Sequence, residues 1–255
     1  MNILLTGSDG FIGKNLSVWL SEKRFNVIGL DRNSGDVLFP NELLTCDLNY
    51  DVDVVIHLAG LSGVRQSFEN PTDYWKQNVI VSQRIFDHFK NTRILYASSS
   101  TAKEPWRNPY AMSKYSMEQI APANSLGMRF TTVYGPGARE QMLIPRILKN
   151  NVPYINTNHS RDFIHVYDIC SAIESLLRQS QISAFDEKTG VIDIGTGITN
   201  KLTDIMDHFG ITTEKRVGGD TERLDNKADI NIITSYGWEP QYELKKYIED
   251  NRRTN

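Results

Sequence analysis

The stretch Thr6-Gly7-Ser8-Asp9-Gly10-Phe11-Ile12-Gly13 decides the fold of this 255-residue chain, because it joins a short apolar run to an amphipathic pattern. The run before it, Asn2–Thr6, predicts a buried strand, and Phe11–Lys23 after it predicts a helix. Glycines at this junction let the backbone approach a pyrophosphate, whose charge is favoured by the free N–H groups of a helix N-terminus. The alternative is a glycine-rich turn without a ligand. We expect a dinucleotide-binding turn made by Gly7, Gly10, Phe11, Ile12 and Gly13.

An acidic residue follows the second predicted strand, Asn26–Leu30. Asp31 lies 24 residues after Gly7, where a carboxylate can accept hydrogen bonds from the hydroxyls of an adenosine ribose. Asp31 therefore favours NAD over NADP as the cofactor. Arg32 keeps the other choice open, because a guanidinium beside Asp31 would suit a 2′-phosphate.

Short apolar runs alternate with amphipathic stretches through the rest of the chain. Further strands are predicted at Leu43–Cys46, Asp53–His57, Arg93–Ser98, Gly127–Val133 and Val191–Ile194, and further helices at Pro71–Lys90, Tyr110–Ile120, Glu140–Lys149 and Tyr167–Gln179. This alternation predicts an α/β protein with a Rossmann-type, doubly wound parallel sheet. We expect residues 1–133 plus 164–197 to form an NAD-binding domain. Residues 134–163 plus 198–255, which are more polar and irregular, would form a small C-terminal substrate-binding lobe.

Composition narrows the class of partner. The net charge of −3 and the pI near 6.0 give no electrostatic footprint for nucleic acid or an anionic membrane, so a small-molecule partner is expected. The two cysteines and five histidines show no metal-ligand spacing, and no metal site is predicted. Neither a leader pattern nor a long apolar run is evident, which predicts a cytoplasmic protein.

The sharpest catalytic signal is Tyr110-Ala111-Met112-Ser113-Lys114, which follows a run of serines at the end of a predicted strand. Tyr110 and Lys114 lie on one helix face, so the ammonium group can lower the pKa of the phenol. With Ser99 nearby, Tyr110 can take a proton from a substrate alcohol while a hydride leaves the same carbon for nicotinamide. The alternative is a surface Tyr/Lys pair of no function.

Two further segments end strands that would lie over the same cofactor. Asp47 and Leu48 follow one strand, and the small residues of Leu58-Ala59-Gly60 follow the next, where they would allow a dinucleotide to lie close. Asp47 has an alternative role as the cap of a turn. His57, just before the second segment, is expected to be a hydrogen-bonded core histidine rather than a catalytic group.

Taken together, these motifs resemble the extended short-chain dehydrogenases that act on nucleotide sugars. The resemblance spans nearly the whole chain and includes Val133-Tyr134-Gly135-Pro136, Arg161-Asp162-Phe163, Asp193 to Gly197 and Gly237-Trp238-Glu239-Pro240. Within this family, the segments His57 to Ser67 and Thr132 to Met142 are most similar to UDP-glucuronate 4-epimerases. The resemblance implies an NAD-dependent nucleotide-sugar 4-epimerase that works through a transient 4-keto sugar, with a UDP-hexose or UDP-uronate as its substrate.

The same resemblance implies a set of sugar and nucleotide contacts. Ser100, Thr101, Thr132 and Arg139 would surround the sugar and hold a carboxylate, although Ser100 and Thr101 have an alternative role in ordinary turn hydrogen bonds. Arg161 would reach the nucleotide phosphates, and Arg223 is a candidate second clamp.

The chain also departs from the family. Only eleven residues separate Ser99 from Tyr110, where relatives place a longer loop, and the helix that carries Tyr110 is short. Dimers of the family pack this helix and its predecessor into a four-helix bundle, so the resemblance implies a homodimer, while the shortened interface helix argues against the usual form of that dimer. Three alternatives stay open: a UDP-glucuronate decarboxylase, a 4-keto-sugar reductase, or a non-catalytic NAD-binding sensor protein.

Overall fold

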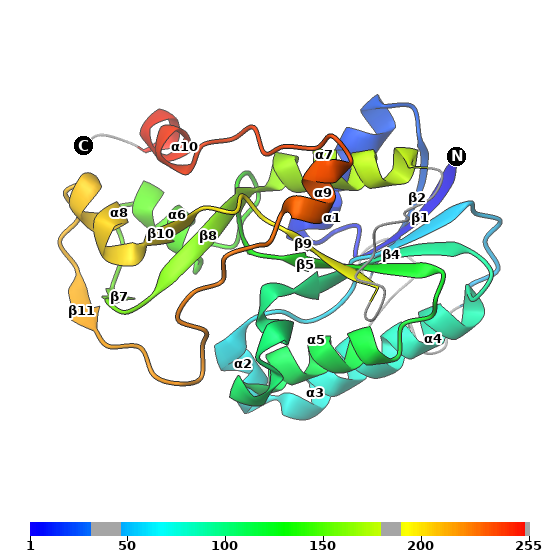
Figure 1. Cartoon of the computed structure of the whole chain (residues 1–255), viewed down its shortest axis with the longest axis horizontal. Helices are drawn as coiled ribbons and strands as arrows, with labels where there is room; N and C mark the ends of the chain where they lie inside the picture. The colour runs from blue at the N-terminus through cyan, green and yellow to red at the C-terminus, as the bar shows by residue number, and fades with distance from the viewer. Residues whose placement is uncertain (32–46, 180–189, 253–255) are drawn as a thin grey trace.

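Six parallel strands form the central sheet in the computed structural model, which describes residues 1–31, 47–179 and 190–252 (Figure 1). The strands of this sheet are β1 (Asn2–Thr6), β2 (Asn26–Leu30), β3 (Val54–His57), β4 (Arg93–Ser99), β5 (Ser125–Phe130) and β9 (Val191–Ile194). Their order is β2-β1-β3-β4-β5-β9, and every neighbouring pair is parallel. The prediction of a Rossmann-type α/β fold is confirmed, while the strand expected at Leu43–Cys46 lies outside the described residues.

Helices cover both faces of this sheet (Figure 1). Those helices, together with the ones that follow in the second half of the chain, are α1 (Phe11–Glu22), α2 (Val64–Glu69), α3 (Pro71–Trp75), α4 (Val81–His88), α5 (Pro109–Gln119), α6 (Leu143–Leu148), α7 (Val166–Arg178), α8 (Leu202–His208), α9 (Asn231–Ser235) and α10 (Leu244–Asn251). Two 3-10 turns, Ser100–Lys103 and Pro105–Arg107, connect β4 to α5.

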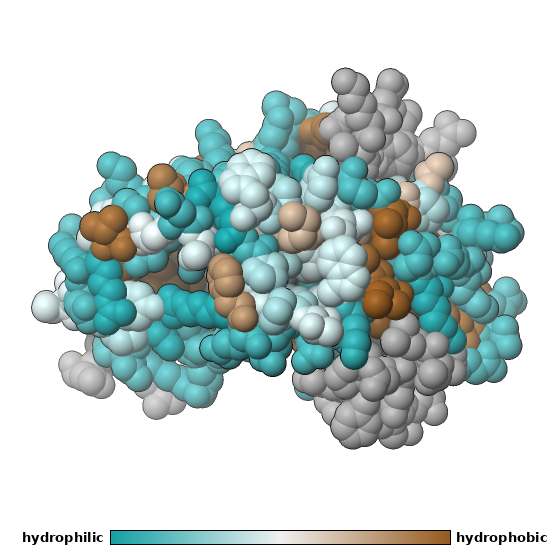
Figure 2. Space-filling view, turned by 90° about the horizontal axis from the view of Figure 1, so that it is seen from below, coloured by the Kyte–Doolittle hydropathy of each residue, from teal (hydrophilic) through white to brown (hydrophobic). Residues whose placement is uncertain are grey.

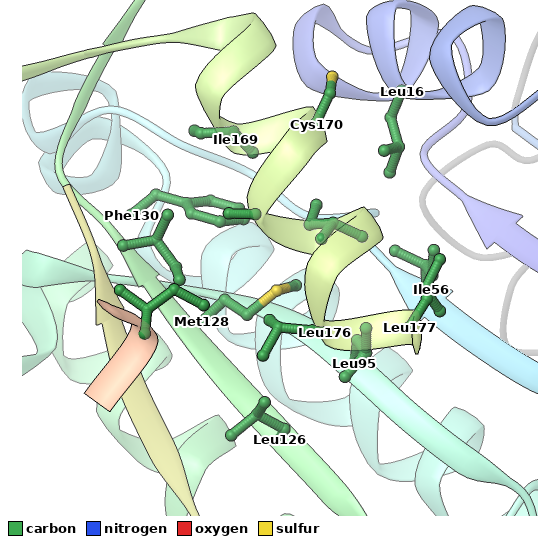
Figure 3. Close-up of a cluster of buried hydrophobic side chains, with 14 of the residues drawn as sticks. Leu16, Ile56, Leu95, Leu126, Met128, Phe130, Ile169, Cys170, Leu176 and Leu177 are labelled. Atoms are coloured by element: carbon green, nitrogen blue, oxygen red, sulfur yellow. The ribbon is translucent and has the colours of Figure 1, made fainter. Parts of the chain in front are cut away.

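Alternation along the strands explains the two layers. Ile3 and Leu5 of β1 face α1 and α7, whereas Leu4 between them faces α4. All three side chains are completely buried. Figure 3 shows the first layer, in which Leu176 and Leu177 of α7 lie toward strand residues that include Met128, while Cys170 of the same helix points toward Leu16 of α1. Strands that are buried on both faces account for the continuous apolar runs in the sequence.

One predicted strand and one predicted helix are divided in the structure. The run Gly127–Val133 breaks at Thr131, so that β5 ends in the parallel sheet and β6 (Thr132–Tyr134) pairs with a different strand. The helix predicted over Pro71–Lys90 is interrupted by a π-helical segment, Lys76–Ile80. Both corrections concern tertiary contacts that local periodicity does not report.

Two small sheets lie beside the main one. The first contains β10 (Thr199–Lys201), β8 (Ser160–His165) and β6, and the second pairs β11 (Glu214–Arg216) with β7 (Tyr154–Asn156). A separate apolar cluster packs beneath them, drawn from α6, α8 and α10 as well as these strands. α9 is not part of this second cluster, because its Ile233 packs with the core of the main sheet. The proposed division into a domain of residues 1–133 plus 164–197 and a lobe of residues 134–163 plus 198–255 stays a prediction.

Candidate active site

The glycine turn lies at the carboxyl end of β1, next to the point where the strand order reverses. Gly7 has φ +74°, and its amide donates to the carbonyl of Leu30 at 2.9 Å. A Cβ at Gly7 would lie 2.7 Å from the backbone nitrogen of Ala59, and one at Gly13 would lie 2.0 Å from the carbonyl oxygen of Gly7. Phe11 and Ile12 begin α1 directly after the turn. Backbone packed this closely forms the cradle that a pyrophosphate requires, so these residues fit a dinucleotide.

Asp31 follows β2 and contacts the same turn. One of its carboxylate oxygens accepts a hydrogen bond from the backbone nitrogen of Asp9 at 2.9 Å. This contact fixes the carboxylate beside the glycine turn, where the sequence places the ribose of a dinucleotide. The ribose contact stays a prediction, and Arg32 lies outside the described residues.

The next two predicted cofactor segments differ in character. Asp47 is exposed and accepts a hydrogen bond from the Asn49 backbone at 3.0 Å, which is the turn-capping alternative, while Leu48 is buried in the core. Ala59 donates its backbone N–H to the Thr6 hydroxyl at 3.3 Å, which holds the segment Leu58–Gly60 against β1. This second segment therefore lies beside the glycine turn, as the sequence predicts.

His57 is a core histidine. Its Nδ1 lies 2.7 Å from the Thr6 hydroxyl and its Nε2 lies 2.9 Å from the Ser82 hydroxyl, so both ring nitrogens have partners. Burial, and then the charge of Lys114, lowers the pKa of His57 to about 3. A neutral, fully hydrogen-bonded imidazole is suited to packing rather than proton transfer.

Tyr110 and Ser99 meet at the carboxyl end of β4. The Ser99 side chain lies close enough to Tyr110 to lower the pKa of its phenol, and the hydroxyl of Ser99 accepts a hydrogen bond from the Thr101 hydroxyl at 2.9 Å. The Asn108 side chain caps α5 by accepting from the Ala111 backbone at 2.7 Å, which fixes the first turn that carries Tyr110. The local sequence thus brings the two predicted catalytic hydroxyls together.

The net pKa of Tyr110 differs from the sequence prediction. Lys114 is buried and donates from Nζ to the carbonyl of Ala97 at 2.8 Å. Burial raises the pKa of Tyr110 above its ordinary value, and the Ser99 side chain and the charge of Arg139 oppose that rise. The net pKa of the phenol is thus raised by burial rather than lowered, while the predicted action of Lys114 on Tyr110 stays a prediction.

Asn78 is a buried polar residue that the sequence interpretation missed. It lies in the π-helical segment, where its Oδ1 accepts from the Leu61 backbone at 2.8 Å and its Nδ2 donates to the Ser113 hydroxyl at 2.9 Å. Asn78 thereby links the loop after β3 to the helix that carries Tyr110. Its signal in the sequence was an amide at a position where a helix covered on that face would carry an apolar side chain.

The predicted sugar-binding residues come from three separate parts of the chain. Arg139 is exposed, and it donates to the Ser62 hydroxyl at 3.1 Å, which brings it to the loop after β3. Its charge also acts on Tyr110. Thr132 accepts a hydrogen bond from the Asn226 side chain at 3.0 Å. The charged group and the catalytic hydroxyl therefore share one region, although 29 residues separate them in sequence.

The two predicted phosphate arginines are both engaged in ion pairs. Arg161 binds Glu222 at 3.0 Å and donates to the carbonyl of Arg223 at 3.0 Å. Arg223 binds Glu104 at 2.9 Å and donates to the carbonyl of Ser100 at 2.8 Å. These contacts tie the segment around residue 223 to the short loop between β4 and α5, which narrows that side of the site.

A dinucleotide-type glycine turn beside a Ser99–Tyr110–Lys114 cluster defines a Rossmann-fold protein of the short-chain dehydrogenase class. The model of the "NAD dependent epimerase/dehydratase family" matches residues 3–195. The chain belongs to this family. Its members use NAD and are short-chain dehydrogenases of the extended type.

One relative supports the same family, and two solved structures share the fold. A protein of Methanocaldococcus jannaschii, provisionally named UDP-glucose 4-epimerase, is 30% identical over 97% of this chain and 96% of its own. UDP-glucuronic acid 4-epimerase from Bacillus cereus, solved with UDP-glucuronic acid and NAD, is 24% identical, with a TM-score of 0.81 over 99% of this chain and 98% of its own. The NDP-hexosamine 5,6-dehydratase TunA is 23% identical, with a TM-score of 0.82 over 98% and 96% of the two chains.

Proposed function

We propose that this protein is an NAD-dependent nucleotide-sugar 4-epimerase that acts on a UDP-hexose or UDP-uronate through a transient 4-keto sugar. The observation that carries the proposal is the placement of Ser99, Tyr110 and buried Lys114 together, at the same sheet edge as the glycine turn. Family membership adds the cofactor and the reaction class.

The chain's own residues would move one proton. Tyr110 accepts the proton of the sugar 4-hydroxyl as the carbon is oxidised and returns it when the ketone is reduced, while Ser99 orients that oxygen. Bound NAD supplies hydride acceptance and return at C4. The raised pKa of Tyr110 makes a charge from Lys114 or Arg139 useful, because a phenolate in a buried site needs a nearby cation.

A uronate is the favoured sugar. Ser100, Thr101 and Thr132 offer hydroxyl groups and Arg139 offers the guanidinium, a combination suited to a carboxylate. A 4-keto uronate loses carbon dioxide when its carboxylate aligns with the carbonyl, so the grip on that group separates an epimerase from a UDP-glucuronate decarboxylase. A 4-keto-sugar reductase would share only the last half of the chemistry.

The nucleotide would bind between the predicted NAD-binding domain and the predicted substrate-binding lobe. Arg161 and Arg223 are the candidate phosphate ligands, and binding requires a diphosphate to replace Glu222 and Glu104 as their partners or to join them. Figure 2 shows a hollow on the underside of the molecule, toward the end that carries β7 and β11. We propose that this end forms the substrate-binding lobe.

A homodimer through the α3 and α5 side of the molecule is part of the proposal. Large apolar side chains are exposed on these two helices and on α2, which contacts both of them, namely Phe68 at 49%, Trp75 at 46% and Met112 at 41% of their surface. Exposed apolar side chains on neighbouring elements are typical of an association surface. Within the described residues no helix is long and apolar enough to cross a membrane.

Product analysis on a panel of UDP-sugars tests the enzyme assignment. Wild type is expected to interconvert UDP-glucuronate and UDP-galacturonate, and Tyr110→Phe to lose at least about 100-fold in kcat while it still binds NAD. Tyr115→Phe is the matched control, because Tyr115 lies on the same helix but is exposed. Equal activity of the Tyr110 and Tyr115 variants would remove Tyr110 from the mechanism.

The same assay separates the alternatives. Pentose products would identify a decarboxylase, and consumption of reduced cofactor with a 4-keto sugar would identify a reductase. NAD binding without turnover of any UDP-sugar would leave the sensor protein. Turnover of UDP-glucose but not UDP-glucuronate would retain the 4-epimerase and contradict the carboxylate site.

A further inference from the structure

Glu118 is a completely buried carboxylate directly behind the proposed catalytic groups. It lies on α5, four residues beyond Lys114 and eight beyond Tyr110, so the three side chains follow one helix face. Its exposed side-chain fraction is 0%. A buried carboxylate is retained only where its charge is compensated.

Three hydrogen bonds compensate this carboxylate. Arg129 of β5 binds it in bidentate fashion, with Nε 2.8 Å from Oε1 and Nη2 2.6 Å from Oε2. The hydroxyl of Ser98 donates to the same Oε1. The geometry is therefore a planar ion pair plus one neutral hydrogen bond, which fixes the orientation of the carboxylate.

Three consecutive residues of β4 are tied to this helix face. The carbonyl of Ala97 accepts from Lys114, the hydroxyl of Ser98 donates to Glu118, and the Ser99 side chain lies near Tyr110 and lowers the pKa of its phenol. The first and third ties involve proposed catalytic groups. The middle tie has no part in the proposed proton transfer, yet it sets how α5 is positioned along the strand.

The charges around Lys114 make Glu118 more than a packing contact. His57 of β3 is neutral and lies close enough to Lys114 to feel its charge, and Arg129 belongs to β5. On α5, Lys114 lies between Tyr110 and Glu118. Burial lowers the pKa of Lys114 to about 8, and Glu118 is the charge that acts in the opposite direction. Arg129 shares that carboxylate, which limits the effect.

We propose that Glu118 is a positioning residue of the active site, which holds α5 in register against β4 and supplies the carboxylate charge that supports the Lys114 ammonium group. The inference deepens the proposed function and rests on it, since it gives Lys114 its charged role. Because Arg129 pairs with the same carboxylate, Glu118 serves both a structural arginine and the buried active-site lysine.

Two substitutions that break the same ion pair should have opposite effects on the pH profile. Glu118→Gln removes the carboxylate charge, so Lys114 loses its proton more easily, and the alkaline limb of kcat should move down by about one pH unit. Arg129→Gln leaves the carboxylate to Lys114 alone, so the limb should move up. Ser98→Ala removes only a neutral hydrogen bond and should leave the limb in place.

A titration without turnover gives the second measurement. The Cε resonance of Lys114, labelled with carbon-13 and assigned through Lys114→Arg, should titrate near pH 8 in the wild type. It should shift down in Glu118→Gln and up in Arg129→Gln. Shifts in the same direction for both variants, or none, would show that the cluster only stabilises the fold and would overturn the inference. Should Glu118→Gln fail to fold, the upward shift in Arg129→Gln decides alone.

These outcomes are distinct from failure of the proposed function. An active Tyr110→Phe or Lys114→Ala would refute the catalytic assignment, whatever the titration shows. Inactive forms of both, combined with an unchanged limb in Glu118→Gln, would keep the enzyme and refute the role of Glu118.

Discussion

Replacement of Gly13 by alanine tests the close packing of the dinucleotide turn. Gly13 lies in the first turn of α1, and a Cβ there would sit 2.0 Å from the carbonyl oxygen of Gly7 and 2.9 Å from the Cα of Ser8. Both atoms belong to the backbone, which cannot rotate away as a side chain would. The helix and the turn must therefore separate to admit a single methyl group.

Two effects of opposite sign set the magnitude. Alanine is favoured over glycine inside a helix by about 1 kcal/mol, so Gly13→Ala would stabilise the protein if the space were free. Overpacking of a tight core costs about 1–3 kcal/mol, occasionally more, and a contact of 2.0 Å belongs at the upper end. We expect a net loss of about 2 kcal/mol, which corresponds to a fall in Tm of about 4–8 °C.

Urea unfolding and calorimetric titration with NAD measure the two consequences. Unfolding should reveal the loss of stability. NAD should bind at least about tenfold more weakly, because a loss of about 1.4 kcal/mol in binding free energy already raises the Kd tenfold. Gly219→Ala is the control, since a Cβ at Gly219 meets nothing within 4 Å. A Gly13→Ala protein as stable as wild type, with unchanged NAD affinity, would refute the packing argument.

Three further predictions concern charge. NAD should bind more tightly than NADP in calorimetry, because Asp31 would repel a 2′-phosphate; equal affinities would contradict this. Arg139→Ala should weaken UDP-glucuronate binding about tenfold or more and release some pentose product, seen by proton NMR, since a charge-assisted hydrogen bond contributes roughly 1.5–3 kcal/mol. His57 has a pKa of about 3 when folded and 6.5 when unfolded, so its contribution is complete above pH 6.5 and is lost as the pH falls. Urea unfolding should therefore show stability falling by up to about 1.4 kcal/mol per pH unit below pH 6.5, less steeply in His57→Gln.

Most strands of the main sheet and the local part of the site can be predicted from the amino-acid pattern alone. Asn2–Thr6, Asn26–Leu30 and Val191–Ile194 form strands with the predicted bounds. β1 and β9 are almost completely buried, so their apolar composition identifies them, whereas β2 is only partly buried and is identified by the run Val27, Ile28 and Leu30. Tyr110 and Lys114 could be paired from their spacing, because residues four apart share a helix face. Gly13 could be identified as a position of close packing, because the turn and the helix are adjacent in the sequence.

Only the tertiary structure decided where the charged groups of the site go. Lys114 donates to the carbonyl of Ala97, a partner set by how deeply α5 packs against β4. Arg139 donates to Ser62, and Arg223 binds Glu104, which is 119 residues away in the sequence. Sequence periodicity does not predict such pairs, because the partner of a long side chain depends on which distant sheets and loops the tertiary fold places next to it. Burial, which is likewise a property of the whole fold, then moved the pKa of Tyr110 opposite to the direction that the local spacing predicted.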